Sequence, residues 1–238
     1  MGLYRDEAVV VRTYKLGEAD RIIVLFTRDR GKVRAVAKGV RKTSSRFGAR
    51  LEPMSHVALQ LYEGRELDTI TQAESIEHFR ELRDDLERIT RAASMLEAVD
   101  QMSEEREPNS KLFTMLLGAL RTLAAQNHPL VAPAFFWKLL ALEGFRPMVD
   151  ACVVCERTDE LCAFDLDEGG VLCADHRRGT ALTPDALALL QAILGGKLAS
   201  ALAAHLSPAT LDIEHLATRA MEHHLERRLR SVGVLDRG

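Results

Sequence analysis

The sequence predicts an α+β protein of several domains, with an N-terminal β-barrel, an α-helical bundle body and a small inserted module that contains cysteines. Short strand-like runs occupy residues 7–71, and amphipathic helical patterns follow from residue 80. Two pairs of metal-ligand residue types interrupt the helices within residues 150–180. With 238 residues, of which 47% are hydrophobic, the chain can bury a core in each of two main domains.

Residues 1–79 contain five short runs that alternate between apolar and polar residues or are rich in β-branched ones. Alternation in the fourth run turns Val57, Leu59 and Leu61 inward and His56 outward. Five strands in so short a stretch are typical of an oligonucleotide/oligosaccharide-binding barrel, the OB-fold. An SH3-like barrel or a simple antiparallel sheet has similar spacing, and periodicity does not choose among the three. The runs cover residues 8–11, 21–27, 32–38, 56–62 and 67–71.

Residues 31–50 hold seven Lys and Arg residues and no acidic residue. Lys32, Arg34 and Lys38 fall on one side of a strand, and a polar loop with further cations follows. Positive charge on a folded surface suits a phosphate backbone better than a small substrate, so we expect the strand half to be a preformed surface for phosphates. A solvated strand and a disordered loop would have the same composition. The predicted nucleic-acid contacts are Lys32, Arg34, Lys38, Arg41, Lys42 and Arg46.

The charge of the chain is distributed unevenly. Residues 1–50 contain thirteen Lys and Arg against five Asp and Glu, a net charge of +8, whereas residues 51–110 contain six against fifteen, a net charge of −9. The formal net charge of −3 therefore hides a cationic module attached to an acidic body, as expected of an anion-binding face. Only Phe47 and Tyr62 accompany the cations as aromatic residues, so base stacking should contribute little.

Helical spacing of apolar residues begins at residue 80. Residues 131–143 are almost wholly apolar and include the only tryptophan, Trp137, so this segment is predicted to be the buried centre of the bundle. Arg227, Arg228 and Arg230 complement the dipole of the last helix, with phosphate contact as the alternative. The predicted helices cover residues 80–102, 111–126, 131–143, 184–194 and 210–230.

Two pairs of residues have the spacing of a metal site. Two residues separate Cys152 from Cys155 and Cys173 from His176, and seventeen residues lie between the pairs. This is the knuckle spacing of tetrahedral zinc, with free thiols as the alternative. Four protein ligands leave no position for an activated water, so we expect one structural Zn²⁺. Cys162 falls outside both pairs and is expected to be a small buried hydrophobic residue.

These patterns divide the chain into four predicted parts. They are an OB-fold DNA-binding domain at residues 1–79, a first helical part at 80–149, a zinc-binding module at 150–180 and a second helical part at 181–238. No Gly-rich GK[ST] loop, HExxH motif or Gly-x-Ser-x-Gly elbow is present, so we expect a protein that is not an enzyme. No uncharged apolar run is long enough for a signal peptide or a membrane span, which predicts a cytoplasmic location.

Several short motifs follow one another in an order that resembles the RecO family of bacterial recombination mediators. Each motif is modest alone, but together they are specific and cover essentially the whole chain. The family commonly has Cys where this chain has His176, and imidazole is also a good zinc ligand. The N-terminal motifs are Gly17-Glu18 with Asp20, Phe26-Thr27, Gly31, Ala37–Arg41, Ser45–Gly48, Leu51 and Pro53. The central ones are Leu140, Gly144–Pro147, Cys152, Cys155, Gly169-Gly170 and Cys173.

The resemblance implies a non-enzymatic protein of DNA repair and homologous recombination, associated with the bacterial nucleoid. RecO-like proteins bind single- and double-stranded DNA largely without sequence specificity and anneal complementary strands. With their partner RecR they help to load the recombinase RecA onto DNA coated by single-strand-binding protein, whose C-terminal tail they also bind. The resemblance also implies that the metal supports folding, because some members of the family lack a complete metal site.

Two functions from other classes remain open on the sequence. The chain could be an adaptor in which the barrel holds a protein partner and the zinc module supports the contact, without direct DNA binding. It could also be a zinc-dependent hydrolase that acts on nucleic acid. The charge asymmetry favours DNA binding over the adaptor, and the complete ligand set disfavours the hydrolase.

Overall fold

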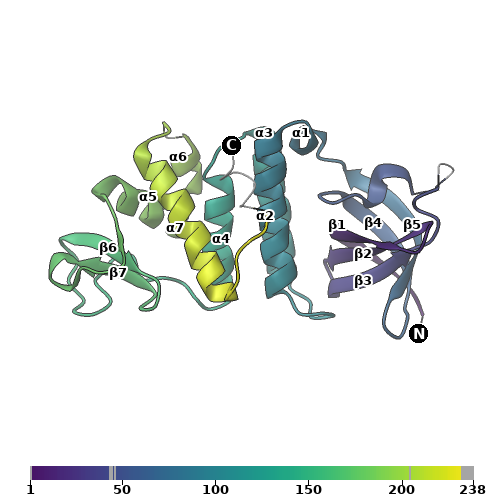
Figure 1. Cartoon of the computed structure of the whole chain (residues 1–238), viewed down its shortest axis with the longest axis horizontal. Helices are drawn as coiled ribbons and strands as arrows, with labels where there is room; N and C mark the ends of the chain where they lie inside the picture. Colours follow the sequence, from purple (N-terminus) through teal and green to yellow (C-terminus); the bar gives the residue numbers. More distant parts are fainter. Residues whose placement is uncertain (1, 43–44, 46, 204, 232–238) are drawn as a thin grey trace. The chain divides into compact units, whose positions relative to one another are not determined.

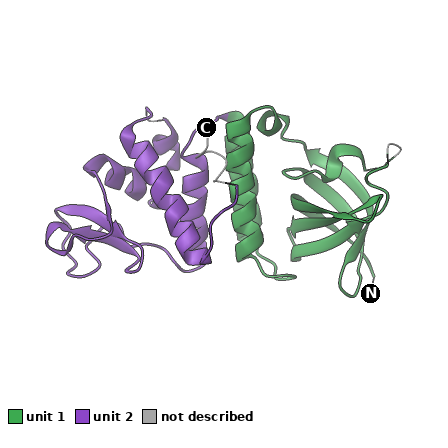
Figure 2. Cartoon of the chain, in the orientation of Figure 1, with its two compact units in different colours: residues 1–125, 234–238 green, residues 126–233 purple. Residues whose placement is uncertain are grey.

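The computed structural model describes residues 2–42, 45, 47–203 and 205–231 (Figure 1). These residues form two compact units, one that extends to Ala125 and one that begins at Gln126, and each is described by itself (Figure 2). The division falls inside the predicted helical body. Boundaries at residues 79, 149 and 180 therefore stay a prediction about domains, whereas the packing of the chain separates the barrel and its first helices from the rest.

The first unit begins with a closed five-stranded barrel in the order β1-β2-β3-β5-β4. All neighbouring strands are antiparallel except β3 and β5, which pair in parallel over only two residues of each strand. Closure with this strand order confirms the OB-like barrel over the simple antiparallel sheet. The strands are β1 (Leu3–Leu16), β2 (Asp20–Thr27), β3 (Gly31–Ala37), β4 (His56–Tyr62) and β5 (Asp68–Glu77), with a short 3-10 helix, η1 (Gly48–Leu51), before β4.

Alternation of side chains builds the barrel core. In β3, Val33, Ala35 and Ala37 are buried while Arg34 is exposed, as the period of two requires. Phe47, from the segment between β3 and β4, is also buried in this core. Phe47 is therefore not available to stack on a base, because its apolar ring fills the barrel.

Three helices complete the first unit: α1 (Arg80–Arg83), α2 (Leu86–Met102) and α3 (Ser110–Ala125). The sequence predicts one helix over 80–102, and the structure breaks it at Asp84-Asp85. Asp85 is extended and its carboxylate accepts a hydrogen bond from the Arg88 amide at 3.0 Å, so it caps a new helix. Figure 1 shows α2 and α3 running alongside each other.

His56 is buried although it faces outward from the barrel, as predicted. It lies on the outer side of the barrel wall, as alternation requires, but α3 covers that side. The ring of Phe113 packs edge-on at 6.0 Å between centroids, and the Glu77 carboxylate lies 3.1 Å from Nδ1. Strand periodicity gives the face of a side chain and does not say whether a later helix packs on that face.

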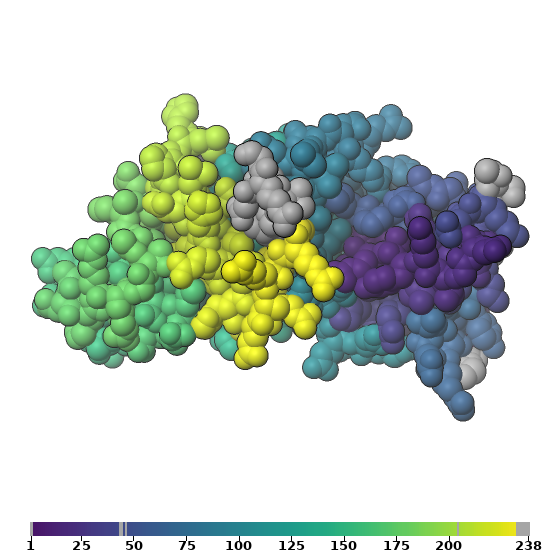
Figure 3. Space-filling model, in the orientation of Figure 1, coloured from purple at the N-terminus to yellow at the C-terminus, as the bar shows by residue number. Residues whose placement is uncertain are grey.

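The second unit is a helical bundle with an inserted three-stranded antiparallel sheet in the order β7-β6-β8. Its central helix is α4, where Trp137 is buried as predicted and its ring lies 5.6 Å from that of Phe164. Helix α7 packs against α4, and its outer side is visible in yellow-green in Figure 3. The elements are α4 (Val131–Leu142), β6 (Leu161–Asp165), β7 (Gly170–Cys173), η2 (Ala174–His176), β8 (Thr180–Ala181), α5 (Pro184–Leu194), α6 (Leu198–Ala203) and α7 (Pro208–Leu225).

The last helix is shorter than the sequence predicts. It ends at Leu225 because Glu226 adopts a left-handed conformation with φ of 51°. Arg227, Arg228 and Arg230 therefore follow the helix and do not form its last turn, where His223 and His224 are the basic residues. Among the helices of the described residues, none has both the length and the apolar character that crossing a bilayer demands.

Candidate metal centre and nucleic-acid surface

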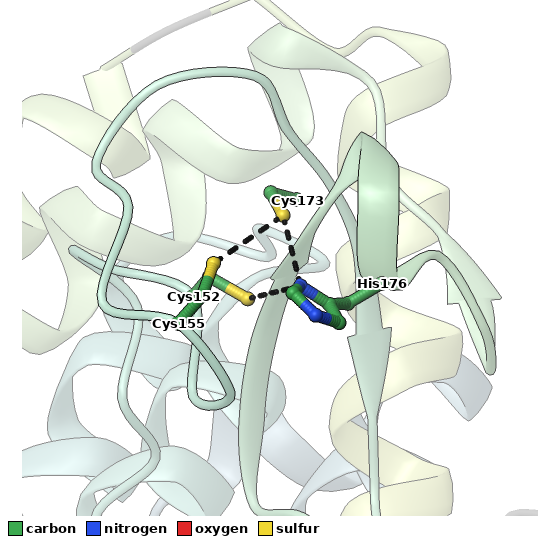
Figure 4. A group of neighbouring side chains, drawn as sticks. All are labelled: Cys152, Cys155, Cys173 and His176. Atoms are coloured by element: carbon green, nitrogen blue, oxygen red, sulfur yellow. Dashed lines mark hydrogen bonds between the residues drawn. The ribbon is translucent and has the colours of Figure 1, made fainter.

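Four side chains converge in the inserted module, and they are the four that the spacing predicts. Cys152 and Cys155 lie in the loop before β6, Cys173 ends β7 and His176 belongs to η2. Their ligand atoms all lie within 4.8 Å of one another (Figure 4). The Cys173 Sγ atom is 3.3 Å from His176 Nδ1 and 3.7 Å from Cys155 Sγ. Cys162 stands apart from this cluster.

Backbone contacts hold the two halves of the cluster together. The Val153 amide donates to the Val171 carbonyl at 3.0 Å, which fixes the first cysteine pair against β7. Gly170 makes this approach possible, because a Cβ there would lie 2.5 Å from the Met148 carbonyl oxygen and 2.5 Å from Val153 Cγ1. Arg157 adds an ion pair of 2.9 Å to Asp175, which lies beside the second ligand pair.

The local environment separates the two cysteines of the first pair. Burial opposes ionisation of Cys152, but hydrogen bonds from backbone groups at Cys173, Val154 and Cys155 outweigh it and lower the pKa of Cys152 to about 6. For Cys155, a backbone hydrogen bond at Arg157 lowers the pKa. Burial and the neighbouring thiols of Cys152 and Cys173 raise the pKa, and together they outweigh that hydrogen bond. The net pKa of Cys155 is raised. Within the first pair, Cys152 is thus the thiol that ionises more readily.

Three sulfur ligands and one imidazole nitrogen form a complete tetrahedral donor set, and this cluster could hold a metal ion. Because all four ligands come from the protein, the arrangement supports a structural role and leaves no open coordination position for a substrate. No second group of three or more such side chains occurs among the residues that the structure describes.

The predicted nucleic-acid residues fall into two groups on the barrel. Lys32 and Arg34, from β3, contact carboxylates of the same unit. The Lys32 side chain is only 16% exposed and lies 3.7 Å from an Asp100 carboxylate oxygen. The Arg34 guanidinium faces both oxygens of Glu105, with Nη2 3.2 Å from Oε2. Lys32 and Arg34 are therefore neutralised within the chain, whereas Lys38, the third cation predicted on this strand, lies in the turn after β3.

The predicted contacts Lys38, Arg41 and Lys42 lie beyond β3 and are exposed. Lys38 and Lys42 are exposed and have no carboxylate partner within the described ranges. Arg41 is also exposed, and its guanidinium donates to the backbone carbonyl of Glu18 at 2.9 Å, which holds it in place without neutralising it. Arg46 lies outside the described residues.

The structure adds Lys15 and Tyr14 to this group, which the sequence reasoning missed. Lys15 is exposed near the end of β1 and is opposite Arg21, and Arg21 is opposite Ala37, the residue before Lys38. The β-register therefore puts Lys15 at the same end of the barrel as Lys38 and Arg41. Tyr14 is 45% exposed beside it. We call Lys15, Lys38, Arg41 and Lys42 the cationic end. Strand pairing is the signal that could have identified Lys15, but using it requires knowing the register of β1 with β2 and of β2 with β3.

A cavity of about 610 Å³ lies in the second unit between α4, α7 and the turn from β6 to β7. Its walls include Trp137, whose Nε1 has no hydrogen-bond partner among the described residues, and Phe145, whose ring lies 3.9 Å from that of His224. Arg146 and Glu168 both line it, so the cavity carries both signs of charge. Charge therefore does not select an anionic ligand here.

Comparison with known proteins identifies the family. The family model for "Recombination protein O N terminal" matches residues 1–79, and that for "Recombination protein O C terminal" matches residues 83–232. The chain belongs to the RecO family. Two full-length relatives carry the name DNA repair protein RecO. The one from a Nocardioides species is 47% identical over 248 residues, covering 99% of this chain and 100% of the relative. The one from Frankia casuarinae is 44% identical over 243 residues, covering 100% of both.

Membership in the RecO family confirms the resemblance drawn from the motifs and supports a role in DNA repair and recombination. It agrees with the OB-like barrel, the helical body and the cysteine-containing module. The nucleic-acid contacts remain predictions about individual residues, and the structure shows which of those side chains are paired and which are exposed.

Proposed function

We propose that this RecO-family chain is a mediator of DNA repair and homologous recombination that acts without catalysing a chemical step. It binds single- and double-stranded DNA through the phosphate backbone, largely without sequence specificity, and anneals complementary strands. With RecR it helps to load RecA onto DNA coated by single-strand-binding protein, whose C-terminal tail it also binds. Its place is then at the nucleoid of the bacterial cytoplasm.

The observation that carries the proposal is the cationic end of the barrel. Its four side chains are exposed, they come from the end of β1 and the turn after β3, which the β-register places at the same end of the barrel, and none has a carboxylate partner within the described ranges. Lysine and arginine contact phosphates without reading the bases, so binding of this kind is not sequence-specific. One exposed tyrosine at this end, Tyr14, can add a single stacking contact.

Annealing follows from the same charge. Two complementary strands repel each other through their phosphates, and each phosphate neutralised by the protein lowers that repulsion. Since the contacts do not depend on the bases, the Watson–Crick edges remain free to pair. The barrel then needs no catalytic group for this step.

We propose that the metal is a single structural Zn²⁺. The donor set of Cys152, Cys155, Cys173 and His176 supports zinc, which prefers tetrahedral sulfur and nitrogen ligands. When bound, Zn²⁺ would join the loop before β6 to the end of β7 and stabilise the fold of the module. The protein residues supply that cross-link only as thiolates and neutral imidazole.

A triple substitution tests DNA binding. Changing Lys38, Arg41 and Lys42 to Ala should weaken binding of a fluorescein-labelled single strand of DNA by roughly tenfold or more. The slope of log affinity against log salt concentration should decrease in magnitude by about two to three. The matched control changes Arg65, Arg80 and Lys111 to Ala. These three residues are exposed and belong to the same unit, but they lie outside the cationic end. Equal affinity of the two variants, both folded by circular dichroism, would contradict the proposal and favour the adaptor.

A further inference from the structure

The loop between α2 and α3 lies on the barrel as an added edge segment. We call residues 103–107, Ser-Glu-Glu-Arg-Glu, the acidic segment. Strand β5 pairs with β3 only at Ala35 and Val36, which leaves the edge of β3 at Gly31–Arg34 without a strand partner from β5. The acidic segment takes that place. The Arg106 amide donates to the Lys32 carbonyl at 2.9 Å, and Lys32 and Glu105 form a parallel bridge.

Two further contacts keep the acidic segment in position. Arg106 Nη2 donates to Asp68 Oδ1 at 2.8 Å, and Asp68 is completely buried in the barrel wall. Gly31 has a φ of +65°, and a Cβ added to it would lie 1.8 Å from the Glu107 carbonyl oxygen. The backbone of the segment thus packs directly on β3, and Arg106 anchors it.

With the backbone held, Glu105 lies against Arg34. The ion pair joins the two carboxylate oxygens to the Nε and Nη2 groups of the guanidinium. This paired geometry is also the one that a phosphate adopts on arginine. Both side chains are about half exposed, at 45% for Arg34 and 47% for Glu105. Exposed ion pairs of this kind are weak, so an external polyanion can break this one.

We propose that the acidic segment is an intramolecular competitor of DNA for the outer face of β3. Glu105 occupies Arg34 in the free protein, and a DNA phosphate replaces it while Arg106 keeps the segment on the barrel. DNA therefore first meets the cationic end and extends onto β3 only by displacing Glu105. The inference rests on the proposed function, because it assumes that the barrel binds DNA.

The substitution Glu105→Gln tests the competition. It removes the charge that holds Arg34 and preserves the size of the side chain. We expect DNA affinity at low salt to rise by about three- to tenfold, and the magnitude of the log–log salt slope to increase by about one, since one more phosphate contact becomes available. Because Glu105 is at the surface, the thermal midpoint should change little.

Glu104→Gln is the matched control. Glu104 is the adjacent residue, is exposed and has no partner within the described ranges, and its substitution changes the net charge by the same amount. It should change DNA affinity by less than about twofold. In the double variant Arg34→Ala/Glu105→Gln the gain should disappear, which assigns it to Arg34.

The results separate the inference from the function on which it rests. If the unaltered protein binds DNA and Glu105→Gln binds no more tightly than Glu104→Gln, the competition is overturned and the proposed function stands. If the gain persists in the double variant, Arg34 is not the group released and the inference is also overturned. If the unaltered protein does not bind DNA at all, both proposals fail.

Discussion

Lys32 of β3 donates from Nζ to the main-chain oxygen of Asp100, 2.6 Å away in the last turn of α2. Helix α2 has no basic residue of its own in its last turn. The barrel therefore supplies the cation that the C-terminal carbonyl groups of the helix favour. The Asp100 carboxylate lies 3.7 Å from the same amine, and Arg12 lies 3.5 Å from its other oxygen. Lys32 is thus part of the contact between barrel and helix.

The main effect of replacing Lys32 by Ala should therefore be a lower free energy of unfolding and not a lower affinity for DNA. Loss of a largely buried charge-assisted hydrogen bond at a helix end predicts a decrease of about 1 kcal/mol in the free energy of unfolding. Lys38→Ala is the control, because Lys38 is exposed and should change stability by less than about 0.5 kcal/mol. Denaturant unfolding followed by circular dichroism measures both. Equal stability of the two variants would contradict the role of Lys32.

Replacing Cys152, a proposed metal ligand, should destabilise the inserted module. Cys152→Ser leaves three ligands, and we expect the purified variant to contain little or no zinc and to have a lower thermal midpoint. Cys162→Ser is the matched control, since Cys162 is in the same module but outside the cluster, and it should retain the metal. Metal content by mass spectrometry and thermal unfolding give the result. A metal-free Cys152→Ser protein of unchanged stability would show that the cluster does not support folding.

The contact of Glu77 with Arg121 and His56 should make the first unit sensitive to acid. The hydrogen bond from Arg121 is the largest cause that lowers the pKa of Glu77, against burial, and His56 lowers it further. A carboxylate whose pKa is lower in the folded state adds stability above its unfolded pKa of about 4.3, and this stability is lost as the pH falls below that value.

Glu77→Gln should therefore reduce the stability at pH 7 by at most about 1 kcal/mol, because Arg121 is exposed. At a pH well below the carboxylate pKa the variant and the unaltered protein should converge. The free energy of unfolding at the two pH values measures this difference. A gap that stays constant with pH would rule out ionised Glu77 as the source.

Lys15 should contribute to DNA binding although no sequence motif marks it. Lys15→Ala is expected to weaken binding of single-stranded DNA about two- to fivefold. The slope of log affinity against log salt concentration should decrease in magnitude by about one. Lys111→Ala removes the same charge from an exposed position of α3 and should have a smaller effect. Anisotropy titrations compare the two. If Lys111→Ala weakens binding as much, net charge and not the cationic end is responsible.

The clustering of the four predicted ligand side chains could be foreseen because its signal is local. Two pairs with two intervening residues specify the ligand geometry, and the fold only has to bring the pairs together. The alternation in β3 was likewise sufficient to separate Val33 from Arg34. In both cases, neighbours in the sequence determine the outcome.

The pairing of Arg34 with Glu105 was not predictable from the sequence. The two residues are seventy-one positions apart, and the contact requires the loop after α2 to lie on the edge of β3. The burial of His56 under α3 has the same origin. Periodicity gives the face on which a side chain lies, and long-range packing decides whether that face is solvent, another element or a partner.

The salt dependence of DNA affinity tests the central claim most directly. The cationic end offers four described cations, so binding of the unaltered protein to single-stranded DNA between about 50 and 200 mM salt should give a log–log slope of roughly −3. The slope should be similar for unrelated DNA sequences. An affinity that is insensitive to salt, or confined to one sequence, would contradict phosphate binding by the barrel.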